Sequence, residues 1–61
     1  MKYYAIVAGF TREREYFAER SRETFPKVDA WNLAYKMENA HSRIGNEVRI
    51  VGIEPEKEEE V

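Results

Sequence analysis

Hydrophobic and polar positions divide the chain into four structured segments followed by an acidic end. Residues 2–8 form a continuous apolar stretch that is rich in aromatic and β-branched residues and is stopped by Gly9. Residues 47–53 are also rich in β-branched residues and follow the turn signal Gly45-Asn46. Such runs, bounded by turn residues, are typical of strands. The pattern therefore predicts two strands, and neither face of the first one is polar.

The charged stretch after Gly9 is interpreted as a helix over residues 11–24. Thr11 is a suitable N-cap, and Glu13 and Glu15 would lie in the first turn, where acidic side chains complement the helix dipole. Pro26 would stop the helix. Most side chains of this segment are charged, so the predicted helix is amphipathic with a thin apolar face.

A second helix is predicted from Asp29, taken as its N-cap, to about Ile44, with Gly45 at its end. Its apolar positions recur at the i, i+3, i+4, i+7 spacing of one helix face. The stripe consists of Ala30, Leu33, Ala34, Met37, Ala40, His41 and Ile44.

The order strand, helix, helix, strand predicts an α+β fold. We expect a small two-layer β-α-α-β domain over residues 1–53, in which a two-stranded antiparallel sheet carries both helices on one face. Residues 54–61 are dominated by Glu and contain a Pro, so we expect them to form a flexible, disordered acidic tail.

Splitting the chain at residue 54 changes the meaning of its net charge of −2. The tail contains five Glu and one Lys, whereas the remaining 53 residues contain nine basic and seven acidic side chains. The body is thus slightly basic, which leaves an anionic partner open. The excess is too small for a strongly basic nucleic-acid platform.

The length of 61 residues favours self-association. A domain of this size buries only about 60% of the surface of its unfolded chain. With no Cys and a single His, disulfides and a metal cage are excluded as additional sources of stability. A two-stranded sheet is also marginally stable and has open edges.

We therefore expect a homodimer, formed edge to edge or by stacking of sheet faces. The alternative is a monomer in which long side chains such as Lys2 and Arg49 cover the second face. The expected dimer interface consists of Tyr3, Tyr4, Ile6, Val51 and Ile53.

Catalysis is poorly supported by the sequence. The only His, His41, lies within the apolar helix stripe, and Ser21 and Ser42 have no base at a recognisable motif spacing. We expect no enzyme activity, no metal and no cofactor. No apolar run reaches the roughly 18 residues of a membrane span, and no signal peptide is recognisable, so a cytoplasmic location is expected.

An anion site at Gly9, Arg12 and Arg14 is one hypothesis for function. A strand that passes through a glycine into a helix N-terminus presents free N–H groups to a phosphate. A single glycine lacks the spacing of specific nucleotide-binding loops. The alternative is an ordinary turn with Arg14 paired to a nearby Glu. Exposed tyrosines together with arginines could also bind nucleic acid by stacking on bases.

Trp31 and Tyr35 lie one helical turn apart, beside the apolar stripe. Aromatic residues in such positions often form interface hot spots, and Glu38 would frame the patch. The alternative is that both rings extend the core. The sequence as a whole favours a small homodimeric, non-enzymatic module that binds another protein as a regulator or inhibitor, of the kind often encoded by phages or mobile elements. Binding of nucleic acid or nucleotide phosphate is the second hypothesis.

Overall fold

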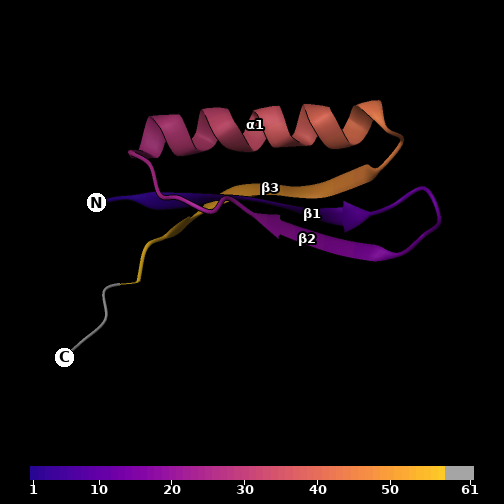
Figure 1. Cartoon of the computed structure of the whole chain (residues 1–61), viewed down its shortest axis with the longest axis horizontal. Helices are drawn as coiled ribbons and strands as arrows, with labels where there is room; N and C mark the ends of the chain where they lie inside the picture. The colour runs from indigo at the N-terminus through magenta and orange to yellow at the C-terminus, as the bar shows by residue number, and fades with distance from the viewer. Residues whose placement is uncertain (58–61) are drawn as a thin grey trace.

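The fold is a three-stranded antiparallel sheet with one helix along one face (Figure 1). The computed structural model describes residues 1–57. The elements in chain order are β1 (Tyr3–Phe10), β2 (Tyr16–Arg20), α1 (Lys27–Arg43) and β3 (Glu47–Pro55). The α+β class is confirmed, whereas the two-stranded sheet and the two helices are wrong: the sheet order is β2-β1-β3, and there is a single helix.

The strands predicted at the two ends of the chain are present and pair with each other. Val7 lies opposite Val51 and Ala5 opposite Ile53. β1 is the central strand, so both of its edges are paired. α1 covers the face with Ala5 and Val7, and on the other face Ala8 is also buried, in keeping with two apolar faces. β3 continues to Pro55, past the predicted domain boundary at residue 54. Residues 58–61 of the predicted tail lie outside the described residues.

The segment predicted as the first helix instead forms a hairpin turn and β2. The N–H of Thr11 donates to the Glu15 carbonyl (2.8 Å), and the N–H of Glu15 donates to Thr11 Oγ1 (3.2 Å). Arg14 adopts a left-handed backbone conformation with φ 69°. Thr11 thus closes a turn with the hydroxyl that would have capped a helix. As a strand, Tyr16–Arg20 pairs with the open edge of β1. As a helix, the same residues would have only a thin apolar face to pack against the rest of the chain, so the strand is favoured.

After β2 the chain stays beside β1. Ser21 donates its N–H to the carbonyl of Ala5 (2.9 Å), and Tyr3 and Phe25 exchange both backbone hydrogen bonds (2.8 Å each). β1 is therefore paired on this side along nearly its whole length, and the chain enters α1 directly from the sheet.

α1 begins after Pro26, with no side-chain cap, and Asp29 lies in its first turn instead of at the N-cap. Its end near Ile44 agrees with the prediction. The N–H of Gly45 donates to Ser42 O (3.1 Å) and that of Asn46 to His41 O (3.0 Å), the two bonds of a Schellman motif. Gly45 has φ 87°, a conformation that side chains disfavour.

The core is small and built from small side chains. Among the described residues, the buried apolar side chains are Ala5, Val7, Ala8, Ala30 and Ala34. Alanines in α1 let the helix backbone lie close to the sheet. Gly9 allows an equally close approach at a bulge between β1 and β3, where a Cβ would lie 2.0 Å from the Glu47 carbonyl oxygen.

Candidate interaction surfaces

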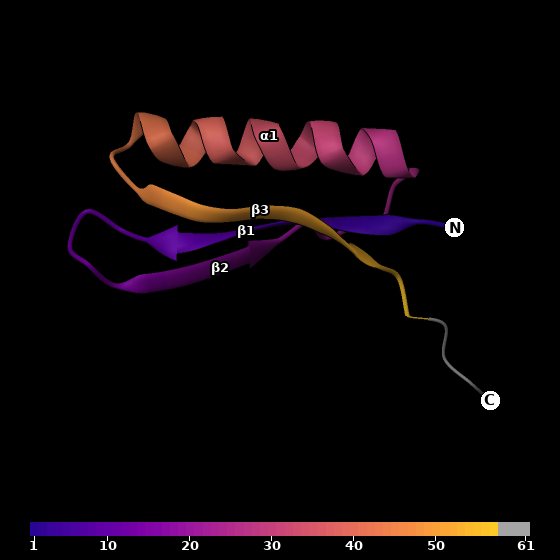
Figure 2. The ribbon, with the colours of Figure 1, turned by 180° about the vertical axis from the view of Figure 1, so that it is seen from behind.

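The face of the sheet opposite α1 carries no helix (Figure 2). Phe17 and Glu19 of β2 contact His41 of α1, so the alternate β2 residues point to the other side. The pairings Ile6 with Arg20 and Phe10 with Tyr16 extend this assignment to β1. The apolar and aromatic residues of this surface, called the open face below, are Tyr4, Ile6, Ala8, Phe10, Tyr16, Ala18 and Ile50.

Arginine side chains lie over two of the aromatic rings of the open face. The guanidinium carbon of Arg20 is 4.3 Å from the centroid of the Tyr4 ring, and that of Arg49 is 5.6 Å from the Phe10 ring. Phe10 and Tyr16 form an edge-to-face pair with centroids 5.9 Å apart. The strands thus present a row of rings and guanidinium groups.

The charges of the open face are balanced. Arg49 donates a hydrogen bond from Nε to Glu47 (3.0 Å) and forms an ion pair with the same carboxylate. Glu54, opposite Tyr4 in the register, adds a second negative charge at the end of the sheet where Arg20 lies over the Tyr4 ring. The open face is therefore apolar and aromatic with no net charge.

His41 of α1 contacts β2 through stacking and a hydrogen bond. Its ring stacks on Phe17 (4.4 Å between centroids, 24° between planes). Its Nδ1 lies 2.9 Å from the amide nitrogen of Asn46, and its Nε2 lies 2.6 Å from Glu19 Oε1. Because the amide nitrogen can only donate, Nδ1 accepts this hydrogen bond. Nε2 is then the protonated nitrogen, and its N–H donates to Glu19 Oε1. This predicted core histidine is thus a bridge between two elements.

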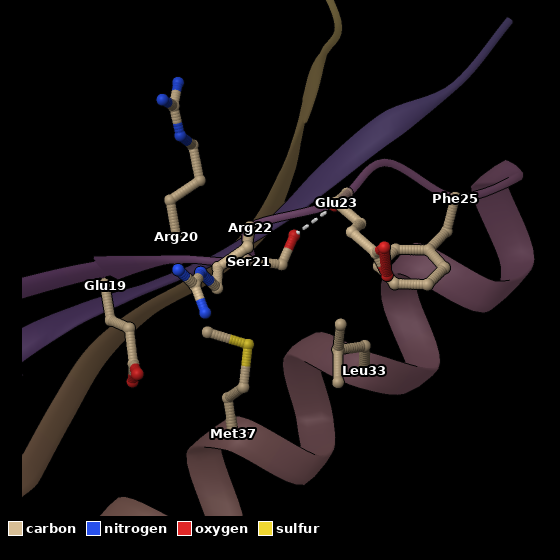
Figure 3. Close-up of a pocket in the computed structure, with 8 residues that line it drawn as sticks. All are labelled: Glu19, Arg20, Ser21, Arg22, Glu23, Phe25, Leu33 and Met37. Atoms are coloured by element: carbon tan, nitrogen blue, oxygen red, sulfur yellow. Dashed lines mark hydrogen bonds between the residues drawn. The ribbon is translucent and has the colours of Figure 1, made fainter.

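Away from His41, a groove of about 610 Å³ separates α1 from β2 and the segment that follows it (Figure 3). Leu33 and Met37 point into it from α1, whereas Arg20 extends away, toward the open face. The Ser21 hydroxyl donates to Glu23 O (2.8 Å) and accepts from the N–H of Ala5 (3.0 Å), so it is engaged in structure. The lining residues are Glu19, Arg20, Ser21, Arg22, Glu23, Phe25, Leu33 and Met37.

The residues expected at a dimer interface are divided between the two faces of the sheet. Tyr4 and Ile6 belong to the open face. Tyr3, Val51 and Ile53 alternate with them and share the face covered by α1. One flat contact cannot include all five.

The residues of the predicted anion site do not form a phosphate cradle. Gly9 lies inside β1, and a turn follows the strand where a helix N-terminus was expected. Arg14 Nη1 lies 3.9 Å from Glu47 Oε1, and the side chain of Arg12 lies against Gly45. In the turn, the N–H groups of Thr11 and Arg14 donate to Glu15 O and Thr11 O, within the hairpin itself.

Trp31 and Tyr35 stack on one flank of α1, with ring centroids 5.8 Å apart. Trp31 and Glu38 are half-buried, whereas Tyr35 is 52% exposed. The helical repeat places this flank on the side away from Leu33 and Met37. The predicted patch is thus brought together on the helix and does not join the open face.

Sequence reasoning missed the functional potential of Tyr16, Phe17 and Arg20, because their segment was interpreted as helical. A signal was present: two adjacent aromatic residues, of a type favoured in strands, followed by Ala18. The turn before them contains no Gly, Asn or Pro, so the usual hairpin signal was missing.

The described residues contain no group of three or more potential metal ligands. Within residues 1–57, α1 is too short and too polar to cross a membrane. Comparisons of the chain with protein-family models, curated proteins and solved structures gave no match.

Proposed function

We propose that the protein is a non-catalytic module that acts as a homodimer and binds another protein through the open face of its sheet. The observation that carries this proposal is the composition of that face. Tyr16 and Ile50 are 65% and 54% exposed, beside rings that arginines cover. Tyr and Arg dominate interface hot spots, and uncovered apolar patches mark interaction sites.

The balanced charge of the open face favours a protein partner over a nucleic acid. Nucleic-acid binding draws most of its affinity from phosphate neutralisation, yet Glu47 and Glu54 offset the two arginines. Single-stranded nucleic acid is a second candidate because Arg20 and Arg49 lie over aromatic rings, an arrangement that can stack bases.

The homodimer is supported by the size of the core. Within residues 1–57, the buried side chains are four alanines and one valine, which limits the apolar area that one copy removes from water. Small domains of this kind often gain stability by association. The small core therefore favours association with a second copy.

A pair of matched variants tests the open face. Ile50→Glu places a charge on the open face, and Tyr35→Glu places one on the flank of α1 at a site of similar exposure. Proteins from the source cells that bind immobilised wild type should also bind Tyr35→Glu and should be lost with Ile50→Glu. Circular dichroism checks that both variants are folded.

Two outcomes would contradict the proposal. Loss of binding with Tyr35→Glu alone would move the partner site to the Trp31 flank. Binding of a single-stranded oligonucleotide that falls steeply between 50 and 200 mM salt, without any bound protein, would favour the nucleic-acid candidate.

A further inference from the structure

The outer edge of β2 has unpaired backbone groups at three positions. The Ser21 N–H donates to β1 at one end of the pairing, and Glu15 O accepts from Thr11 at the other. Backbone groups alternate in direction along an antiparallel strand, so residues 17 and 19 also face β1. The N–H and C=O groups of Tyr16, Ala18 and Arg20 therefore point outward, away from the sheet.

Nothing among the described residues protects this edge. β2 contains no proline and pairs with β1 without a bulge. α1 packs over β1 and β3, and its contact with β2 is through His41 at one end. An unprotected edge is a template for pairing with another strand.

We infer that β2 pairs antiparallel with β2 of a second copy, with Ala18 on the twofold axis. In this register Ala18 lies opposite the partner's Ala18, and Tyr16 lies opposite the partner's Arg20. All three outward-facing residues then exchange backbone hydrogen bonds with the partner strand. A shift of two residues in either direction leaves Tyr16 or Arg20 outside the paired strands, which makes this register the one that satisfies the whole edge.

The side chains in this register are complementary. On the open face, Arg20 meets the ring of the partner's Tyr16, repeating the contact that it makes with Tyr4 in its own chain. On the other face, the partner's Phe17 comes opposite Glu19, at the groove lined by Leu33 and Met37. The second copy thus brings an aromatic ring beside the groove into which Leu33 and Met37 point.

The edge dimer leaves the proposed binding surface free. Antiparallel pairing about a twofold axis keeps both helices on one side and joins the two open faces on the other. The inference rests on the homodimer of the proposed function and specifies its contact. A dimer stacked through the open face would instead bury Ile50 and cover the proposed binding surface.

Proline at position 18 is the direct test, because it removes an outward-facing N–H and no bond to β1. Proline is tolerated on edge strands at such positions. The molar mass is measured by light scattering during size-exclusion chromatography from 10 to 500 µM. Wild type and the matched control Ala18→Val should be dimers of the 7.3 kDa chain. Ala18→Pro should be a folded monomer, with self-association at least 100-fold weaker.

A cross-linking variant keeps the test decisive if Ala18→Pro does not fold. The chain has no cysteine, and Cα atoms of a hydrogen-bonded antiparallel pair are about 5.5 Å apart, within disulfide range. Ala18→Cys should form a disulfide-linked dimer under mild oxidation, whereas the control Asn39→Cys, on the exposed side of α1, should remain reduced.

The outcomes separate the inference from the proposed function. A monomeric wild type at all concentrations would overturn both the homodimer and this contact, and would leave the edge to a strand of a different protein. A dimeric wild type with a dimeric Ala18→Pro, or with no cross-link from Ala18→Cys, would keep the homodimer and overturn the edge contact.

Discussion

The two edges of the sheet differ in how they are protected. At β3, Glu56 donates its N–H to Lys2 O (2.9 Å), so the alternation along the strand points the nitrogen of Pro55 outward, where it has no hydrogen to donate. β3 also carries the bulge opposite Gly9 and lies beneath α1. These are features by which proteins avoid pairing at an edge.

β2 has the opposite character. It pairs with β1 without a bulge, and it combines Tyr16, Ala18 and Arg20 on the open face with backbone groups that point outward. The β3 edge thus carries local features that disfavour pairing, whereas the β2 edge offers backbone groups that another strand can join.

The largest effect is expected where β1 joins the protected strand. Gly9→Ala would place a methyl group 2.0 Å from the Glu47 carbonyl oxygen. The backbones of β1 and β3 are hydrogen-bonded to each other and cannot easily move apart to relieve this contact. The free energy of unfolding should fall by about 3 kcal/mol or more. Gly52→Ala is the matched control, since no other atom lies within 4 Å of the position that the added Cβ would occupy. Urea unfolding measures both, and equal stabilities would show that the bulge is not tightly held.

His41→Ala should loosen the unprotected strand specifically. The variant loses the stacking on Phe17 and the hydrogen bonds to Glu19 and Asn46, a loss of about 1–3 kcal/mol. Native-state amide exchange should show faster opening of β2 than of β3. Asn39→Ala, on the exposed side of the same helix, is expected to change neither rate. An equal rise in the amide exchange rates of β2 and β3 would mean that the sheet opens as one unit.

Tyr16→Ala should weaken dimerisation without preventing it. Two symmetric contacts with the partner's Arg20 are lost, at about 0.5 kcal/mol each, so the dissociation constant should rise roughly fivefold. Sedimentation equilibrium measures this change, with Tyr35→Ala as the exposed control. An unchanged constant would argue against the register centred on Ala18.

Pro55→Ala should have the smallest effect. The bulge and α1 still protect the β3 edge, so stability should stay within about 0.5 kcal/mol and no new assembly should form. Light scattering at high concentration checks this. Growth of larger assemblies would show that Pro55 alone keeps the β3 edge from pairing.

The sequence correctly predicted those elements whose residue pattern fits only one type of secondary structure. The apolar runs around Val7 and Val51 are rich in β-branched residues and lie next to turn residues, and both form strands. The stripe containing Ala30 and Ala34 repeats at helical spacing over several turns. The end of α1 was also predictable, because Gly45 supplies the left-handed conformation that a Schellman motif needs.

The hairpin could not be predicted because its residues favour two structures equally. Thr11 caps a helix or closes a turn with the same hydroxyl, and the turn uses Arg14 at positive φ where Gly or Asn is usual. The choice is made by the unpaired edge of β1, a tertiary effect. The misplaced anion site follows from this error, and without β2 neither the open face nor the outward edge can be derived. The mixed dimer interface has another cause, because its residues alternate between the two faces of β1 and β3.

Amide hydrogen exchange distinguishes an edge that pairs with a second copy from an edge that does not. Exchange is followed by NMR at a protein concentration well below and well above the point of self-association. The N–H groups of Tyr16, Ala18 and Arg20 should become strongly protected as the concentration rises, while those of Val51 and Ile53, which point outward from β3, should not change. Concentration-dependent protection at β3, or none at β2, would contradict the account.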